Sequence, residues 1–286
     1  MTGELRERAL TRADLPAALR LSIQAGWNQV EDDWRVMLAD GGAIGFETPQ
    51  ADLIATALTV RLGARLAWIS MVLVDQAWRR RGLGTRLLER CIALLSDHGV
   101  IAGLDATPAG RLVYAPLGFQ PLYGISRLVI EPSCAPAAEL PRDVALRPLG
   151  ADDLAALADW DAARSGMRRE RLLADLRQRL PAAAWLAIRA GAIAGCVLGR
   201  NGRLSNQIGP VMADDAPTAR ALLATALRAT GRAAILDLPD RHAGFQAWLR
   251  DAGAVQQRDY TRMLLGPPTL LPPPDPLFAI AGPELG

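Results

Sequence analysis

The chain of 286 residues has few side chains able to form disulfides or bind metals. Its three cysteines, Cys91, Cys134 and Cys196, are too few and too widely spaced for a disulfide framework. Neither of its two histidines, His98 and His242, has metal-ligand spacing to a cysteine. We therefore expect no bound metal, and free thiols of this kind suit a reducing cytoplasm.

Long apolar runs and an excess of one charge are also missing. No segment reaches the roughly 18 apolar residues of a membrane span, and the charged amino-terminal residues show no export signal. The 32 basic residues nearly balance the 30 acidic ones, so we expect neither nucleic acid nor membrane as a partner. The length suits a soluble, cytoplasmic enzyme of two domains, with no particular oligomeric state indicated.

A glycine- and arginine-rich loop is the most informative motif that is present. Residues 79–84 read Arg-Arg-Arg-Gly-Leu-Gly, directly after the apolar run 67–74 and before the helical stretch 85–96. At a helix start the unpaired N–H groups and the helix dipole favour a phosphate, and glycines let it approach the backbone closely. The arginines add cations. The motif therefore predicts a pyrophosphate-binding loop between a strand and a helix.

The same loop also allows a purely structural interpretation, a glycine turn followed by a solvated basic helix end. It does not match the dinucleotide fingerprint, because Gly-x-Gly-x-x-Gly is absent, and it is not a Walker loop, because no Gly-Lys-Ser or Gly-Lys-Thr follows. A second motif, Tyr-Ala-Pro-Leu-Gly-Phe at residues 114–119, favours the functional interpretation. It follows a predicted strand at 100–105.

Together the two motifs resemble the GNAT superfamily of acetyl-CoA-dependent N-acetyltransferases, over roughly residues 5–130. The resemblance implies that the loop binds the pyrophosphate of acetyl-CoA through backbone amides and that the preceding strand hydrogen-bonds the pantetheine arm. It also implies that Tyr114 is the general acid that protonates the departing thiolate. Thr107 stands where many members have an asparagine. The cofactor-binding residues implied in this way are Val72, Leu73, Val74, Arg79, Arg80, Arg81, Gly82, Leu83, Gly84, Thr85 and Thr107.

A faint internal repeat runs through the chain with an offset of 135 to 139 residues. Residues 10–19 reappear at 149–157 and residues 70–75 at 208–213, as expected for one unit present twice. In the second copy, the segment 214–217 reads Asp-Asp-Ala-Pro in place of the glycine-arginine loop, and Leu249 replaces the tyrosine. Carboxylates repel a phosphate and proline has no amide donor, so we expect CoA in the first copy alone.

The repeat and the prolines between its copies define the predicted organisation. Residues 1–130 form a catalytic GNAT domain, 131–142 a linker, 143–265 a degenerate GNAT-like domain and 266–286 a proline-rich tail whose Leu277, Phe278 and Ile280 can dock back. The fold class is α/β (α+β), with tandem GNAT-like domains that each have a mixed, mostly antiparallel central sheet flanked by helices. Helices are predicted at 15–25, 31–38, 85–97 and 218–230, and strands at 43–47, 53–62, 65–74 and 100–105.

The general base that takes the proton of the attacking amine has no clear signature. The central strand 66–74 carries no acid, unlike the many family members with a glutamate in this region. Each candidate carboxylate alone is more often a surface charge or a helix cap. The candidates are Glu31, Asp32, Asp33, Asp105 and a water held by Ser70.

Residues 26–34 are a candidate acceptor wall, because they follow the first helix, where this superfamily builds its variable acceptor site. The segment supplies two tryptophans with an amide and a carboxylate, and Trp27 over an ammonium would give a cation–π contact of about 0.5 to 2 kcal/mol. The alternative is that both tryptophans fill the core. The predicted substrate residues are Trp27, Asn28, Asp33 and Trp34.

These observations predict an enzyme that transfers the acetyl group of acetyl-CoA to an amine of a small acceptor, by direct attack in a ternary complex. The architecture is similar to two-domain members in which an active amino-terminal GNAT domain is joined to a vestigial one. Two alternatives stay open, a non-catalytic CoA-responsive binding protein and an O-acetyltransferase. A sensor needs no thiol-protonating phenol, so Tyr114 favours the enzyme.

Overall fold

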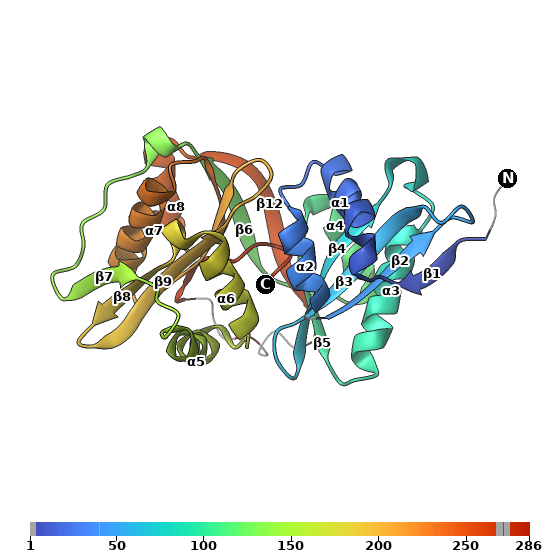
Figure 1. Cartoon of the computed structure of the whole chain (residues 1–286), viewed down its shortest axis with the longest axis horizontal. Helices are drawn as coiled ribbons and strands as arrows, with labels where there is room; N and C mark the ends of the chain where they lie inside the picture. The colour runs from blue at the N-terminus through green and yellow to red at the C-terminus, as the bar shows by residue number, and fades with distance from the viewer. Residues whose placement is uncertain (1–3, 40, 267–270, 272–274) are drawn as a thin grey trace.

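The computed structural model describes residues 4–39, 41–266, 271 and 275–286 (Figure 1). Short 3-10 turns connect several of the regular elements. In the first half of the chain the helices and strands are β1 (Arg6–Ala9), α1 (Leu15–Gln24), α2 (Glu31–Ala39), β2 (Gly41–Glu47), β3 (Leu53–Arg61), β4 (Leu66–Val74), α3 (Leu83–Ser96), β5 (Ile101–Ala106), α4 (Pro108–Tyr114) and β6 (Gln120–Ile130).

The second half repeats much of this order. Residues 135–142, between the halves, have no regular secondary structure. The elements that follow are β7 (Val144–Pro148), α5 (Leu154–Ser165), α6 (Glu170–Arg179), β8 (Trp185–Arg189), β9 (Ala192–Arg200), β10 (Asn206–Ala213), α7 (Ala216–Thr230), β11 (Ala234–Pro239), α8 (Ala243–Asp251), β12 (Val255–Leu265) and β13 (Leu277–Ala279).

All the strands of the described residues belong to one 13-stranded sheet, which runs through both halves of the elongated molecule (Figure 1). The strand order is β1-β2-β3-β4-β5-β12-β6-β11-β10-β9-β8-β7, with β13 beside β10. The pairs β4–β5 and β10–β11 are parallel, and the other pairs are antiparallel. The predicted mixed, mostly antiparallel sheet flanked by helices is therefore confirmed, but it is continuous rather than divided between the halves.

The last strand of each half pairs with the sheet of the other half. Strand β12 lies between β5 and β6, with Thr261 opposite Ala106 and Leu265 opposite Ala102. Strand β6 in turn pairs over Ile125–Ile130 with β11. Figure 1 shows β6 and β12 crossing the middle of the molecule side by side. This strand exchange fixes the two halves to one another through backbone hydrogen bonds.

A bulge in β4 decides which side chains face which layer. Met71 has a positive φ of 51°, and the pairing of β3 with β4 shifts register at this point. Ser70 and Met71 consequently both face α1 and α2, where the Ser70 hydroxyl lies 3.8 Å from the sulfur of Met37. Beyond the bulge, Val72 and Val74 face the α3 side of the sheet. Two apolar side chains of β4 are thus placed beside the glycine loop.

Helix α3 begins inside the glycine loop, two residues before its predicted start. Gly82, at the N-cap, has a positive φ of 74°, which costs a glycine little, and Leu83 is buried in the first turn. The apolar stripe Leu87, Leu88, Cys91 and Leu95 then packs against the sheet, as the helical spacing predicted.

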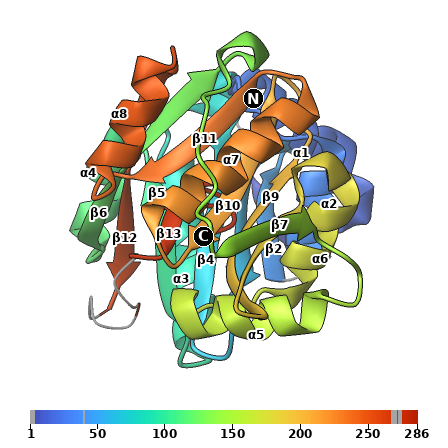
Figure 2. The ribbon, with the colours of Figure 1, turned by 90° about the vertical axis from the view of Figure 1, so that its left-hand side faces the viewer.

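Each parallel strand pair separates after a few residues and leaves a wedge. Residues Leu66–Trp68 of β4 pair with Ile101–Gly103 of β5, and the pairing stops there although both strands continue. The same happens in the second half, where β10 and β11 pair over two residues each. The first wedge opens beside α3, and the second lies beside α7, which Figure 2 shows in front of β10.

The carboxyl-terminal tail docks on the second half. Strand β13 pairs with β10, and the Ile280 N–H donates to Asp237 O of β11 over 2.9 Å, so this segment fills the second wedge. The predicted docking of Leu277, Phe278 and Ile280 is confirmed, because all three are buried. The tail then continues into the first half, where the Trp68 indole donates to Pro283 O over 2.9 Å. Residues 267–270 and 272–274 of the predicted proline-rich segment lie outside the described residues.

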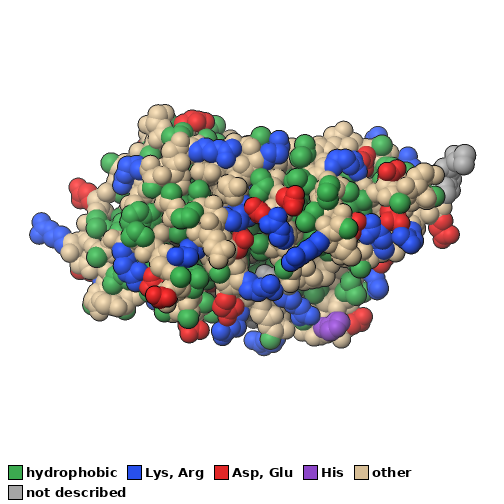
Figure 3. Space-filling view, viewed as in Figure 1, with side chains coloured by type: hydrophobic (Ala, Val, Ile, Leu, Met, Phe, Trp, Pro, Cys, Tyr) green, Lys and Arg blue, Asp and Glu red, His purple; other side chains and the backbone are tan. Residues whose placement is uncertain are grey.

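The surface agrees with the balanced composition. Figure 3 shows acidic and basic side chains interspersed over one face of the molecule. Within the described part of the chain, no helix combines the length and the apolar character needed to span a bilayer.

Candidate active site

A groove of about 260 Å³ lies where the first wedge meets the start of α3. One wall is β4 and the opposite wall is the end of α4. Its lining residues are Val72, Val74, Trp78, Arg79, Arg80, Gly82, Leu83, Gly84, Thr85, Val113 and Tyr114.

The start of α3 gives this groove its chemistry. Gly82 has no side chain to accept from the first-turn N–H groups, and the first helical hydrogen bond runs from Arg86 N to Gly82 O. A Cβ added at Gly84 would meet Val74 only at 3.8 Å, so the backbone here is open to a ligand. Free amides, the helix dipole and neighbouring guanidinium groups are features that favour an anion at this end of the helix.

Three of the predicted cofactor residues do not line the groove. Leu73 points to the opposite face of β4 and is buried in the core. Arg81 stacks its guanidinium 4.7 Å from the ring of Trp78. Thr107 caps α4, where its hydroxyl accepts from Gly110 N over 3.1 Å, and it lines a neighbouring cavity instead.

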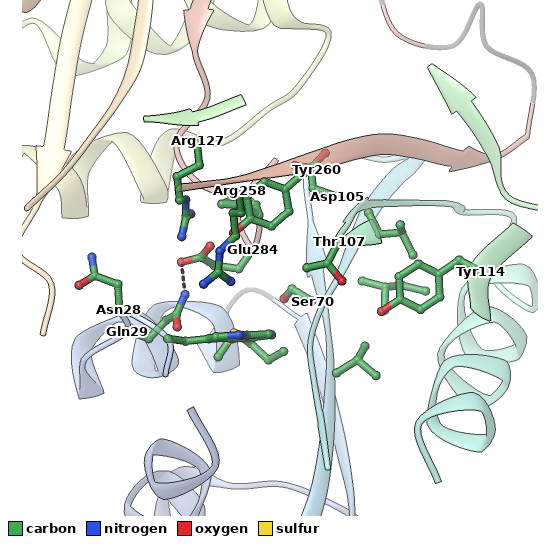
Figure 4. A pocket seen from close by; sticks show the side chains of 16 residues that line it. Asn28, Gln29, Ser70, Asp105, Thr107, Tyr114, Arg127, Arg258, Tyr260 and Glu284 are labelled. Carbon is green, nitrogen blue, oxygen red and sulfur yellow. Dashed lines mark hydrogen bonds between the residues drawn. The ribbon is translucent and has the colours of Figure 1, made fainter. Parts of the chain in front are cut away.

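That neighbouring cavity, of about 150 Å³, lies between the two halves (Figure 4). It shares Val72 and Tyr114 with the groove, so the two spaces meet at these residues. Its lining residues are Trp27, Asn28, Gln29, Ile69, Ser70, Met71, Val72, Leu104, Asp105, Thr107, Tyr114, Arg127, Arg258, Tyr260, Pro283 and Glu284.

Tyr114 stands at the junction as the last residue of α4. Its ring lies 6.3 Å from that of Phe119, and Figure 4 shows its hydroxyl directed toward the cavity. Burial raises the pKa of the phenol, because desolvation disfavours the phenolate. At neutral pH the group is therefore protonated and able to donate a proton into the junction.

The predicted acceptor wall is divided between two environments. Trp27 and Asn28 line the cavity, and the Asn28 carboxamide also binds the backbone of Leu204 and Ser205 from the second half. Asp33 and Trp34 do not reach the cavity.

Asp33 and Trp34 instead hold the fold together. Asp33 is buried and forms ion pairs with Arg179 at 2.6 Å and with Arg200, both from the second half. Trp34 is fully buried, and its indole donates to the Ser22 hydroxyl over 3.1 Å. Both side chains lie on the buried side of α2. The composition of residues 26–34 did not indicate this orientation.

The candidates for the general base are also separated. Asp105 lines the cavity, but both of its oxygens accept from Arg262, at 2.9 and 2.8 Å, and burial raises the pKa of its carboxyl. Ser70 lines the cavity as well. Glu31 is exposed, Asp32 is half-buried, and both pair with Arg35 on the surface of α2.

Five polar lining residues were not predicted from the sequence. Gln29 belongs to the segment already considered, and the other four come from β6, β12 and the tail. Arg258, Tyr260 and Glu284 lie far along the chain from both motifs, and only the strand exchange and the docked tail bring them here. The five are Gln29, Arg127, Arg258, Tyr260 and Glu284.

The corresponding place in the second half is built differently. Asp215 caps α7 by accepting from Thr218 N over 2.8 Å and pairs with Arg189 at 2.7 Å, while Asp214 pairs with Arg164 at 3.0 Å. The wedge beside this helix holds the tail of the chain itself. A first-turn amide and the space of the wedge, which are open to the groove in the first half, are therefore used internally here.

Two segments of the chain, residues 32–121 and 157–279, each match a family model described as an acetyltransferase (GNAT) domain. The chain belongs to the GNAT acetyltransferase family. The two matched segments follow one another along the chain, so it contains two GNAT domains in tandem.

Known proteins similar to this GNAT chain include both a curated relative and solved structures. An uncharacterized N-acetyltransferase, YitH, of Bacillus subtilis (strain 168) is 33% identical over 103 residues, which are 36% of each protein. A putative acetyltransferase from Pyrococcus horikoshii superposes with a TM-score of 0.79 at 20% identity, over 99% of this chain and 96% of that one. A tandem GNAT protein from the clavulanic acid biosynthesis pathway gives 0.64 at 15% identity, over 92% and 99%. These two structures share the fold.

Proposed function

We propose that the first half binds acetyl-CoA in the groove and transfers its acetyl group directly to a small amine held in the cavity. The observation that carries this proposal is the junction: groove and cavity are separate spaces that meet at Val72 and Tyr114. A ternary complex requires this arrangement, because the donor and acceptor must approach from different sides and meet at the thioester. The size of the cavity favours a small acceptor.

The residues of the groove fit the cosubstrate. Its pyrophosphate suits the free amides of Gly84 and its neighbours, Arg79 and Arg80 add positive charge, and Val72 and Val74 offer an apolar wall to the pantetheine arm. The open space over Gly84 supports close approach of a phosphate to the backbone. Acetyl-CoA, when bound, supplies an acetyl group activated as a thioester.

Two side chains are suited to move protons at the junction. Tyr114 keeps its proton and donates it to the departing sulfur. For the proton of the attacking amine we propose Glu284. Its Oε1 accepts from Gln29 over 2.8 Å and from Arg200, whereas the described residues provide no hydrogen bond to Oε2. Asp105 has both oxygens bound to Arg262, so accepting a proton would break that ion pair.

The test is an acceptor screen with the full chain. Acetyl-CoA and a panel of small amines are added, free thiol is followed in time, and products are identified by mass spectrometry. The chain contains no lysine, because all 32 of its basic residues are arginines. Its own side chains therefore provide no amine acceptor. We expect amine-dependent thiol release with an N-acetylated product. Tight CoA binding without turnover on any amine would instead indicate a CoA-responsive binding protein, and an ester product an O-acetyltransferase.

A further inference from the structure

Four charged side chains line the acceptor cavity, and one of them differs from the others because it has no partner of opposite charge in the described portion of the chain. Three of the four charged side chains are each neutralised by a partner behind the cavity wall. The pairs are Asp105 with Arg262, Arg127 with Asp237, and Glu284 with Arg200. The fourth charged side chain is Arg258.

Arg258 has no such partner. Among the residues that the structure describes, no hydrogen bond or ion pair to its guanidinium is found, although it lies in β12 beside a cavity with two carboxylates. It is half-buried, and Figure 4 shows its side chain extending into the cavity on the side of Glu284. The cavity therefore contains one guanidinium in excess, and that guanidinium faces the space where an acceptor would bind.

A second arginine reinforces this positive region. Arg127 and Arg258 both lie close enough to Tyr260 to oppose, through their charge, the rise that burial causes in its pKa. Arg127 is stacked 5.1 Å from the ring of Tyr260 and donates to Asp237 through Nε and Nη2. Both guanidinium groups, one from β6 and one from β12, thus act through their charge on the same aromatic ring.

We propose that Arg258 binds an anionic group of the acceptor, so that the substrate is a small molecule carrying both an amine and a carboxylate or phosphate. A planar guanidinium with free N–H groups matches either anion in a bidentate geometry. An uncharged amine would leave this partly buried cation without a partner. This inference rests on the proposed function, because it specifies the substrate of that same cavity.

The position of Arg258 also sets the orientation of the acceptor. Tyr114 lies at the end of the cavity that meets the cofactor groove, whereas Arg258 belongs to the wall on the side of the second half. An acceptor held by its anion at Arg258 therefore directs its amine toward the junction. The second half, through β12, selects the substrate on which the first half acts.

The test uses matched pairs of acceptors that differ only in the anion. β-Alanine is compared with β-alaninamide for the carboxylate, and phosphoethanolamine with ethanolamine for the phosphate. We expect at least one anionic acceptor to exceed its neutral partner by about tenfold or more in kcat/KM, because a site built to bind a charged group discriminates strongly against its absence. The pair of compounds that shows this difference in kcat/KM identifies whether the bound anion is a carboxylate or a phosphate.

Substitution of the arginine localises the effect. Arg258→Gln should lower kcat/KM for the preferred anionic acceptor about tenfold or more, mainly through KM, and leave the neutral partner unchanged. Arg258→Lys should recover part of the preference. Arg65→Gln, at an exposed arginine outside the cavity, is the matched control and should behave like the unmodified chain.

Calorimetric binding of the same four compounds to the CoA complex provides a readout that does not depend on turnover. Binding of an anionic compound that Arg258→Gln abolishes supports the inference even if no amine is acetylated, in which case the proposed function alone fails. Equal turnover and equal binding of anionic and neutral partners would overturn the inference while the acetyltransferase activity stands. An anion preference that persists in Arg258→Gln would overturn it as well.

Discussion

Gly84 lies in the first turn of α3, with space around it that is open to the groove. In Gly84→Val the new Cβ would contact Val74 at an ordinary 3.8 Å, so the fold should tolerate it, while the methyl groups would occupy the space we assign to the pyrophosphate. We expect the Kd for acetyl-CoA, measured by calorimetry, to rise at least about tenfold.

The matched control for that prediction is Gly244→Val. Gly244 lies in the first turn of α8, and a Cβ there would meet no heavy atom within 4 Å. This variant should fold and bind acetyl-CoA like the unmodified chain. A folded Gly84→Val protein with unchanged affinity would show that the pyrophosphate binds elsewhere.

Tyr114→Phe removes only the hydroxyl at the junction. We expect turnover to fall about 10²-fold or more with little change in cofactor affinity, as for the loss of a general acid. Burial raises the pKa of this phenol above its ordinary value of 10.0, so the group stays protonated at neutral pH and loses its proton only as pH rises through the higher pKa. The unmodified enzyme should therefore lose this contribution only above about pH 10. Turnover within a factor of about two would make Tyr114 a packing residue.

Glu284→Gln tests the proposed proton acceptor. Because a carboxamide cannot take the proton of the amine, we expect kcat to fall about 10²-fold or more with little change in cofactor affinity. Gln29 and Arg200 would still have a hydrogen-bond acceptor in the variant. A kcat within about a factor of two of that of the unmodified chain would assign Glu284 a structural role only.

Residues within a local motif could be predicted, and residues assembled from distant segments could not. The succession of strand, tight turn and helix start around residues 79–84 followed from the sequence, and the loop and Tyr114 line one groove. Asp33 looked equivalent to Asn28 in the sequence, yet the direction of its side chain depends on Arg179 and Arg200, which are more than a hundred residues away. No motif in the sequence around Arg258 marks it as a binding residue.

At the scale of elements, the docked tail makes a measurable contribution to stability. Phe278 is buried between His242, whose ring centroid lies 4.2 Å away, and Phe245 at 5.1 Å. Phe278→Ala leaves a cavity in the second wedge and should lower the free energy of unfolding by about 3–5 kcal/mol, measured with urea.

Val255→Ala is the control for the tail, because Val255 is 69% exposed on β12. Its effect should stay within about 0.5 kcal/mol. A Phe278→Ala protein as stable as this control would mean that the tail is only loosely associated with the wedge. Phe278→Ala should also weaken acceptor binding, since the same tail delivers Glu284 to the cavity.

Helices and strands followed from periodicity because each element has its own apolar face. The spacing of Leu87, Leu88, Cys91 and Leu95 predicted α3, and its observed end differs by one residue from the predicted one. The pairing partners of β6 and β12 did not follow, since an apolar strand satisfies its hydrogen bonds equally well in either half. The order of the strands depends on pairing between distant segments, which the periodicity of a single segment does not indicate.

For the whole molecule, we expect one CoA per chain. Asp215 accepts from one amide at the start of α7, that of Thr218, Asp214 adds negative charge, and the tail fills the second wedge. Calorimetric titration of the full chain with acetyl-CoA should therefore saturate at one equivalent.

A stoichiometry of two would contradict this prediction and show that the second half binds the cofactor as well. Asp215→Ala gives a useful comparison, because it frees a helix-start amide without touching the first half. If the tail in the wedge is what blocks the second half, this variant should still bind one equivalent.

The strand exchange also has a consequence for synthesis on the ribosome. Strand β5 must wait for β12, and Asp105 and Arg262, which form the buried ion pair between them, are 157 residues apart in the sequence. At roughly 5–20 residues per second, the edge of β5 stays unpaired for on the order of 10 s after it emerges. During that time it is open to the same strand of a neighbouring nascent chain, which favours swapped dimers on crowded polysomes. The half that contains the groove is thus synthesised first, but its sheet is complete only when β12 has been synthesised.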